Sequence, residues 1–415
     1  MNLSYKTKFR DFFEYILVYL YIGFSVAPFI SGQEWLLVSI FILLFLVLLG
    51  RRQKVIIKKE YIWFFSALLF VMMMQYVTMG AGDIRSNLGI LVRFLFPLFG
   101  ILILQNRFTQ KYVNVVYILS ILGLTIFCLK NLSPSFNDFI ISLGQNLPFD
   151  EESQQHFIIY SSRAKEHFNF ILSNSGFAYE PGAYSLILGI ALIFNIIEKG
   201  KLLTKYGIVF IISLLSTFST AGYIALFIFL IGYAYQQIII SRRVNRVAVF
   251  FILSFLSFMI FTMADFMQNK IESQVELLQD PYETRGRFAS AQADITTWLT
   301  NPLWGTGKSE STYLETAYQL GFTSEHRVNG LANFLAKFGI FIFILYLYLL
   351  YRSLQIYSRS FGLKDLSYSF YYLALLSLAF SQTCMQWSIL IVLLYLPQTI
   401  TKVNHEQNSN FSLSQ

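Results

Sequence analysis

The chain has 415 residues, of which 55% are hydrophobic and only 13% are charged. Because roughly a quarter of the residues in a soluble domain are charged, this composition excludes a soluble core and predicts an integral membrane protein. The net charge of +8 would suggest nucleic-acid binding in a soluble protein. In a membrane protein, however, Lys and Arg collect in cytoplasmic loops, so we expect no nucleic-acid partner.

Crossing the hydrocarbon core of a bilayer takes about 20 mostly apolar residues, which must form helices because lipid offers the backbone no hydrogen-bond partners. Twelve stretches approach this pattern, which predicts an all-α polytopic membrane protein with a single membrane domain over residues 1–415. In chain order they are Phe12–Ile30, Trp35–Leu49, Tyr61–Met79, Leu88–Leu104, Tyr112–Leu129, Ala183–Ile197, Tyr206–Thr217, Tyr223–Ile240, Val247–Met263, Asn333–Tyr351, Phe370–Gln382 and Trp387–Ile400.

The basic residues give the predicted orientation. If Met1 is cytoplasmic, most Lys and Arg residues fall in inside segments, whereas the short outside connections contain only Arg85. This asymmetry follows the positive-inside rule. With an even number of spans it leaves both termini in the cytoplasm, and residues 403–415 form a polar cytoplasmic tail.

Two long connections lie outside on this topology, residues 130–182 and residues 264–332. Connections longer than about 15 residues are usually functional or disordered, and neither of these is of low complexity. We expect both to be partly helical. In the second, Gly286–Thr300 has the pattern of an amphipathic helix, which Asn301-Pro302 ends. Its apolar side is formed by Phe288, Ile295 and Leu299, and another side is shared by Arg287, Asp294 and Trp298.

Arg93 is the clearest charged residue inside a predicted span. It lies in the sequence Leu-Val-Arg-Phe-Leu-Phe-Pro, several residues from either end of the segment. A charged side chain at that depth costs a few kcal/mol or more in lipid, so Arg93 should face a polar cavity. Its partner there is either a structural group, such as a helix-end carbonyl, or a bound anion.

The first long loop ends in Tyr179-Glu180-Pro181-Gly182, directly at a predicted helix start. Proline in the first turn and an acid beside it suit a helix N-terminus. Glu180 is therefore interpreted either as a cap or as a carboxylate that orients a sugar hydroxyl or takes its proton. Earlier in the same loop, Arg163 is either a solvated charge or a phosphate ligand.

The second loop carries the remaining candidates. Arg285 and Arg287 open the predicted helix, and guanidinium groups pair bidentately with phosphate. Just before the next span stands His326, which is suited to act as a base for a hydroxyl near neutral pH. Arg327 and Asn329 follow it closely.

Several kinds of site have no counterpart in the sequence. It contains no nucleotide-binding loop, no dinucleotide fingerprint and no serine nucleophile elbow. The acidic run Asp150-Glu151-Glu152 has no matching set of metal ligands. We therefore expect neither a metal nor a cofactor, and the free energy for any reaction has to come with the substrate.

Taken together, these residues resemble the bacterial O-antigen and capsule polysaccharide polymerases (Wzy-type), which share a superfamily with the O-antigen ligases. Twelve spans and two large outside loops contribute to the resemblance, which covers most of the chain. The motifs that carry it are Phe177–Tyr184 before a helix, Ser219–Tyr223 at a tight outside turn, Arg285-Gly286-Arg287, Trp298, Asn301–Gly307, His326, Asn329 and Gly339.

The resemblance implies a GT-C-like glycosyltransferase in the bacterial cytoplasmic membrane, active on its outer face. The donor would be a glycan chain on undecaprenyl pyrophosphate, and the acceptor would be the sugar end of a new lipid-linked repeat unit. The resemblance leaves open whether a chain-length regulator protein binds. The implied roles are pyrophosphate binding by Arg93, Arg163, Arg285, Arg287 and Arg327, base catalysis by His326 or Glu180, substrate orientation by Tyr179, Asn329 and Trp298, and sugar stacking by Trp298 and Trp304.

Three other functions stay open. An O-antigen ligase is one, although the Glu180-Pro181-Gly182 junction looks more like that of the polymerases. A lipid-linked oligosaccharide flippase or other transporter is the second, but transporters place polar residues near the bilayer midplane, where Arg93 is nearly alone. The third is a purely structural or receptor role.

Overall fold

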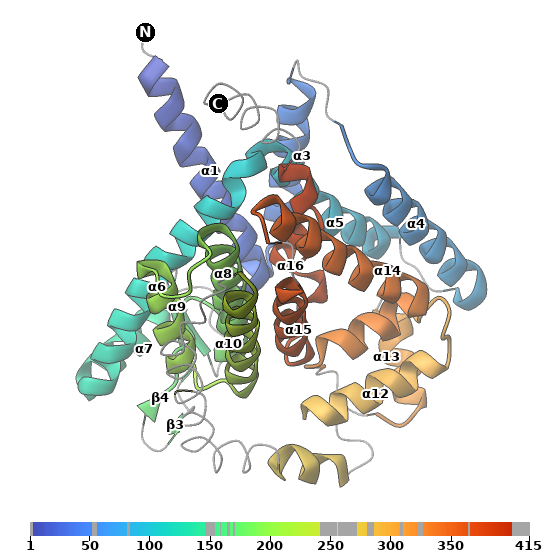
Figure 1. Ribbon diagram of the computed structural model, residues 1–415. Coiled ribbons are helices and arrows are strands. Elements are labelled where there is room, and N and C mark those ends of the chain that lie inside the picture. Colours follow the sequence, from blue (N-terminus) through green and yellow to red (C-terminus); the bar gives the residue numbers. More distant parts are fainter. Residues whose placement is uncertain are drawn as a thin grey trace.

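The computed structural model describes residues 3–51, 56–80, 84–145, 154–157, 159–163, 167–168, 171–240, 255, 272–279, 286–307, 310–322, 327–363 and 366–400. This part of the chain is nearly all α-helical (Figure 1). Its longer helices are α1 (Leu3–Val26), α3 (Glu34–Leu49), α4 (Lys59–Met79), α5 (Ile84–Leu104), α6 (Phe108–Leu132), α8 (Pro181–Lys199), α9 (Lys205–Ser216), α10 (Thr220–Ile240), α14 (Gly330–Ser360) and α15 (Ser367–Phe380).

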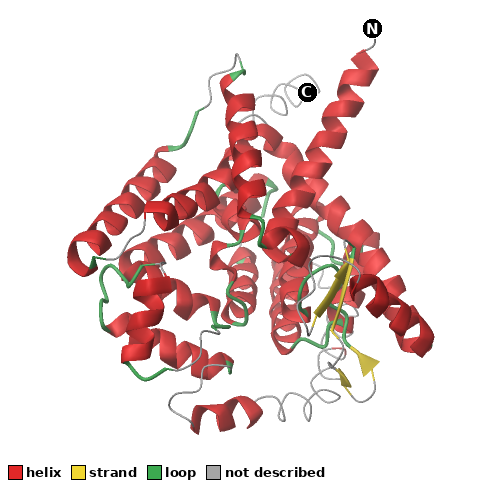
Figure 2. Ribbon diagram, turned by 180° about the vertical axis from the view of Figure 1, so that it is seen from behind, coloured by secondary structure: helices red, strands yellow, loops and turns green. Residues whose placement is uncertain are grey.

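Shorter elements connect these helices. They are α2 (Pro28–Ser31), η1 (Gln105–Arg107), α7 (Pro134–Gln145), η2 (Leu277–Gln279), α12 (Arg287–Leu299), α13 (Glu310–Gln319), η3 (Cys384–Gln386), α16 (Ser388–Leu394) and η4 (Leu396–Thr399). The first long loop also contains two antiparallel hairpins, which the sequence did not predict (Figure 2). They pair β1 (Gln154–Phe157) with β2 (Tyr160–Arg163), and β3 (His167–Phe168) with β4 (Ile171–Leu172).

Within the described residues, four helical stretches are long and apolar enough to cross a membrane. These four are α4, the stretch Ile84–Leu132, α8 and α14. The helices α3, α9 and α15 are also apolar but shorter. Every predicted segment that is described overlaps a helix, while Val247–Met263 lies outside the described residues except for Phe255. The structure thus supports a helical chain suited to a membrane, with fewer full-length spans than the twelve predicted.

The predicted last span, Trp387–Ile400, is not one continuous helix. It consists of α16 and η4, separated at Tyr395, and the residues of both are buried. The 7 residues of α16 rise only about 10 Å, so this helix does not cross the hydrocarbon core by itself. An apolar run buried on all sides produces the same sequence pattern as a span, and this explains the difference.

Helix α8 lies at the centre of the fold. Its residues from Pro181 to Ile197 are all buried, and it packs against α6, α9, α10 and α15. Being apolar all round, it has the composition of a helix enclosed by others. This position matters for function because the junction Tyr179-Glu180 stands directly at its start.

Helix α14 is interrupted at Gly339, whose backbone (φ 72°, ψ 176°) is not helical. An interruption leaves nearby carbonyls without their usual donors four residues on. The turn that follows α12 supplies replacements, because Thr306 N donates to Ala336 O at 2.9 Å and Gly307 N donates to Lys337 O at 3.1 Å. The predicted turn after Asn301-Pro302 is thus anchored in the break of α14.

A helix from the first third of the chain completes this contact. The Gln75 side chain of α4 donates to Trp304 O at 2.6 Å and to Lys337 O at 2.8 Å. In return, Ile340 N donates to Pro302 O at 3.0 Å. Backbone groups on both sides of the break are therefore paired, as burial requires.

The predicted amphipathic helix is confirmed as α12, but its orientation differs from the expectation. The side chains at its predicted apolar positions, Phe288, Ile295 and Leu299, are exposed. The buried side is formed by small or polar residues, namely Ala289, Ser290, Ala293, Asp294 and Thr297. The helix packs this side on α14, and Asp294 pairs with the buried Arg327 in the segment before α14, a contact that periodicity alone does not reveal.

A compact ion-pair network joins α1 to α6. The Glu14 carboxylate, 2% exposed, pairs with Arg107 and lies 3.4 Å from Lys111 Nζ. Lys111 Nζ also donates to Asp11 at 2.7 Å. In Figure 1 the N-terminal end of α1 lies opposite α7, the strands and α12, so the elements of both long loops share the other end of the molecule.

Candidate functional site

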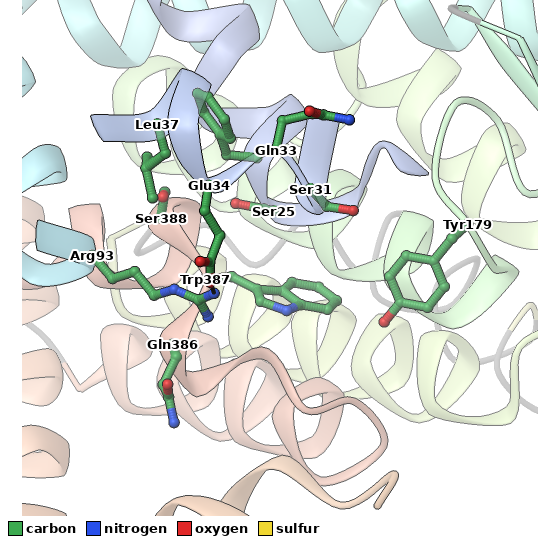
Figure 3. Close-up of a pocket in the computed structure, with 11 residues that line it drawn as sticks. Ser25, Ser31, Gln33, Glu34, Leu37, Arg93, Tyr179, Gln386, Trp387 and Ser388 are labelled. Carbon is green, nitrogen blue, oxygen red and sulfur yellow. Dashed lines mark ion pairs between the residues drawn. The ribbon is translucent and has the colours of Figure 1, made fainter. Parts of the chain in front are cut away.

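A polar pocket of about 190 Å³ surrounds Arg93 (Figure 3). Four separate stretches of the chain form it: the consecutive ends of α1, α2 and α3, the middle of α5, the segment before α8, and the start of α16 with the residues before it. Its lining residues are Phe24, Ser25, Ser31, Gln33, Glu34, Leu37, Arg93, Tyr179, Gln386, Trp387 and Ser388. The expectation that Arg93 faces a polar cavity agrees with this geometry.

The partner of Arg93 is a carboxylate. Its guanidinium lies 3.6 Å from Glu34 Oε1, and the other oxygen of Glu34 lies 3.9 Å from the exposed Arg85. The Arg93 side chain is 32% exposed and that of Glu34 is 62% exposed. Glu34 is the first residue of α3, where a negative charge is favoured by the helix dipole. This partner is a structural group, as one of the two interpretations predicted, but it is a carboxylate and not a helix-end carbonyl.

Trp387 and Tyr179 form the aromatic part of the pocket. Their rings meet edge to face with centroids 6.0 Å apart, a favourable aromatic arrangement. Figure 3 shows the Trp387 indole extending from the Arg93–Glu34 pair toward Tyr179. The Tyr179 hydroxyl donates to Gln382 Oε1 at 3.1 Å. The predicted substrate-orienting residue Tyr179 therefore lies in the pocket and is held by the segment between α15 and α16.

Glu180 occupies the N-cap position of α8 but makes no side-chain capping hydrogen bond. One of the two interpretations of Glu180 was a helix cap. Glu180 has the position of a cap, but its side chain does not make the hydrogen bond that a cap usually makes. The following Gly182 packs closely on Gln382, because a Cβ built on it would lie 2.3 Å from Nε2. The Pro-Gly pair lets the chain start α8 directly against Gln382.

The second long loop reaches the same residue. A Cβ on Gly330, the first residue of α14, would lie 1.9 Å from the carbonyl oxygen of Gln382, so only glycine fits. Asn329 is fully buried and caps α14, accepting from Ala332 N at 2.9 Å. The backbone N–H of Asn329 donates a hydrogen bond to Ser290 Oγ of α12 at 3.4 Å. Both long loops therefore converge on Gln382.

Behind this contact is a buried charged cluster. Arg327 Nε lies 3.3 Å from Asp294 Oδ1, and the two side chains are 4% and 0% exposed. The Tyr313 hydroxyl donates to Asp294 and accepts from Asn333 Nδ2 at 3.0 Å. Burial raises the pKa of Asp294 to about 6, although the Tyr313 hydrogen bond and the Arg327 charge oppose that rise. Burial likewise raises the pKa of Tyr313.

The other predicted residues are distributed around these contacts. Arg287 is half-buried at the start of α12. Trp298 donates from its indole to Pro302 O at 2.9 Å, and Trp304 packs between Phe70 and Phe341. Neither tryptophan lines the pocket. Arg327 is engaged by Asp294, which favours an internal role for it over contact with a ligand.

The side chains of three predicted residues lie outside the described part of the structure. Arg285 and His326 lie outside the described residues, and Arg163 is described only as a backbone position of β2, paired with Gln154. The turn between α9 and α10 lies at residues 217–219, with Phe218 at a positive φ of 49°, so only Ser219 of the predicted turn Ser219–Tyr223 belongs to it and Thr220–Tyr223 begin α10. In the described part of the chain, no three His, Cys, Asp or Glu side chains gather as a metal site would require.

Sequence reasoning missed Glu34 and Trp387. Both lie in short connections between apolar segments, Ser31–Glu34 and Thr383–Gln386 with its neighbour Trp387. A polar or aromatic residue at such a position is common in membrane proteins, so nothing marked either as a site residue. The available signal was an acid in a short connection that the predicted topology places on the same side as the long loops, together with Arg93, the one Arg inside a predicted span.

No protein-family model matches the chain, and no curated protein matches it in sequence. Its function is therefore inferred from its residues and their geometry, together with the motif resemblance described above.

Proposed function

We propose that the protein is a glycosyltransferase of the Wzy type, which polymerises undecaprenyl-pyrophosphate-linked oligosaccharide repeat units on the outer face of the bacterial cytoplasmic membrane. The proposal includes the GT-C-like architecture, the crossing of the membrane about twelve times, and both termini in the cytoplasm. The observation that carries it is the convergence of both long loops on Gln382, beside a polar pocket.

This arrangement suits a transferase better than a transporter. The pocket and the loop contacts lie at the ends of α1, α3, α8, α14 and α16, and only Arg93 reaches the pocket from the middle of its helix, α5. Transporters bind their cargo near the bilayer midplane, between repeated halves. A transferase that joins two lipid-linked molecules needs its polar groups at the surface, where both sugar parts are accessible.

Within this proposal Arg287 binds the pyrophosphate of the donor. Its guanidinium is half-buried at the first turn of α12, where the helix dipole favours an anion. Fixed cations stabilise the charge that develops on a departing pyrophosphate. Arg163 and Arg285 are proposed as further ligands, and His326 or Glu180 as the base that takes the proton of the acceptor hydroxyl.

Reconstitution tests the proposal. The purified protein in liposomes is supplied with the lipid-linked repeat unit of its own source, without nucleotide, and products are separated on a gel. We expect a ladder of longer lipid-linked glycans that is lost in Arg287→Ala and in His326→Ala. The matched control is Arg359→Ala, an exposed residue in the last turn of α14. Movement of the intact unit across the bilayer without any ladder would favour a flippase.

A further inference from the structure

The charges that line the Arg93 pocket balance each other. Among the described residues that line it, Arg93 is the single cation and Glu34 the single anion, and the two groups are 3.6 Å apart. Every other lining residue is uncharged. The second cation near Glu34, Arg85, has a side chain 79% exposed, so its charge is largely screened by solvent.

This balance disfavours a multiply charged anion. A phosphate that contacted the guanidinium of Arg93 would also lie close to the carboxylate of Glu34. Coulomb interactions with opposite charges at similar distances cancel, so the pocket offers a pyrophosphate little net attraction. Sites that hold phosphate use an excess of cationic or N–H donors, which the described lining does not supply.

The same lining matches the hydrogen-bonding pattern of a sugar. A sugar hydroxyl both donates and accepts, so it is best met by groups of both kinds. Glu34 only accepts, Arg93 only donates, and the amides of Gln33 and Gln386 do both. The indole of Trp387 adds a broad apolar surface for the C–H groups of a sugar ring, and its contact with Tyr179 fixes its position (Figure 3).

The size of the pocket limits what it can hold. Its volume is about 190 Å³, which corresponds to about six water molecules. Typical sites for drug-sized ligands have volumes of roughly 300 Å³ or more, so this pocket is smaller than they are. A volume of this order suits one monosaccharide unit, and a longer glycan would extend out of the pocket past Glu34, whose side chain is 62% exposed.

We propose that the Arg93 pocket binds one uncharged sugar residue, at the acceptor end of the lipid-linked repeat unit. This rests on the proposed polymerase function and names the substrate class that this pocket takes. Glu34 accepts hydrogen bonds from the sugar hydroxyls, Arg93 donates to them, and Trp387 contacts the face of the ring. The role of Arg93 is thereby reassigned from pyrophosphate binding to recognition of the acceptor.

Binding is tested separately from catalysis. The purified protein in lipid nanodiscs is titrated at millimolar concentrations with neutral methyl glycosides, with glucuronate and with inorganic pyrophosphate, and saturation-transfer NMR reports which probe binds. We expect at least one neutral glycoside to bind, with about tenfold weaker affinity in Glu34→Gln, since a hydrogen bond to a charged group is lost. Trp387→Phe should also weaken binding. The matched controls are Glu60→Gln and Trp63→Phe, both exposed on α4.

Three outcomes overturn the proposal. They are the absence of binding by every neutral glycoside, equal glycoside binding in Glu34→Gln and the wild type, and pyrophosphate binding that Arg93→Lys abolishes. The polymerisation assay separates this proposal from the function on which it rests. A normal ladder in both Glu34→Gln and Trp387→Phe refutes the acceptor pocket alone, whereas glycoside binding by a protein that forms no ladder refutes the polymerase alone.

Discussion

The hydroxyl of Tyr179 donates a hydrogen bond to Oε1 of Gln382, although 203 positions separate the two residues in the chain. This bond links the end of the first long loop to the connection between α15 and α16. Gln382 is 2% exposed, and its Nε2 has no hydrogen-bond partner among the described residues. The hydrogen bond from the Tyr179 hydroxyl therefore satisfies the oxygen of this side-chain amide, whose nitrogen is unpaired among the described residues.

Tyr179→Phe removes that bond and should lower both stability and activity. Leaving a buried amide oxygen unpaired costs about 1–3 kcal/mol, and the aromatic ring that contacts Trp387 loses its tether. We expect a lower thermal midpoint and a shorter glycan ladder in the reconstituted reaction. The control is Tyr348→Phe, whose side chain is 56% exposed. An unchanged midpoint and ladder in Tyr179→Phe would contradict the prediction.

Gly339→Ala and Gly305→Ala should each destabilise the protein. Both residues have positive φ, 72° and 73°, and a Cβ on Gly305 would lie 2.5 Å from Gly339 N. Strain of this kind costs of order 1–3 kcal/mol, and here a backbone clash adds to it. Thermal unfolding of the purified variants measures the loss. Gly89→Ala is the matched control, because no atom lies within 4 Å of a Cβ at that position, and it should leave the midpoint equal or higher.

Asp294→Asn should flatten the pH dependence of stability. Since burial raises the folded-state pKa of Asp294 to about 6, the folded protein binds more protons than the unfolded chain between about pH 4 and 6. This group therefore lowers the free energy of unfolding as the pH rises through that window, by a few kcal/mol at most. Thermal midpoints measured from pH 4 to 7 should show the wild-type decline reduced in the variant. The exposed Asp138 provides the control, as Asp138→Asn should keep the wild-type slope.

Glu14→Gln should destabilise the protein at neutral pH. The carboxylate is almost fully buried and contacts both Arg107 and Lys111. Removing one partner of a buried ion pair leaves an uncompensated charge, which costs about 3–5 kcal/mol. We expect a clearly lower thermal midpoint and reduced yield of folded protein in detergent. Glu60→Gln, at an exposed position of α4, should behave as the wild type, and similar midpoints for the two variants would refute the role given to Glu14.

Much of the helical fold could be predicted from apolar runs, because a long apolar stretch in a membrane protein has few conformational alternatives. The limit of this reasoning appears in Trp387–Ile400, where burial among other helices gives the same composition as exposure to lipid. The hairpins of the first long loop were missed as well. Their short strands are defined by long-range packing more than by a local pattern.

The candidate site was predictable only in part. Arg93 was found because a charge inside an apolar run is costly, and Tyr179 because of its junction motif. Glu34 was not found, since an acid in a short connection is ordinary and its contact with Arg93 depends on how α3 and α5 pack. In α12, periodicity identified the helix but assigned the wrong side to the interior, because the buried partner of Asp294 comes from a distant segment.

The break at Gly339 divides α14 into two helical parts, and the longer one has the length of a membrane span. From Ile340 to Ser360, α14 rises about 30 Å at 1.5 Å per residue, which equals the thickness of a typical hydrocarbon core. If Ile340–Ser360 crosses this core, the contacts that Gln75 and Trp304 make with α14 at the break lie where the acyl chains end. A thicker membrane would immerse this polar turn in hydrocarbon, and a thinner one would expose the apolar residues below it. The lipid chain length at which the protein works best should therefore be set by a single glycine.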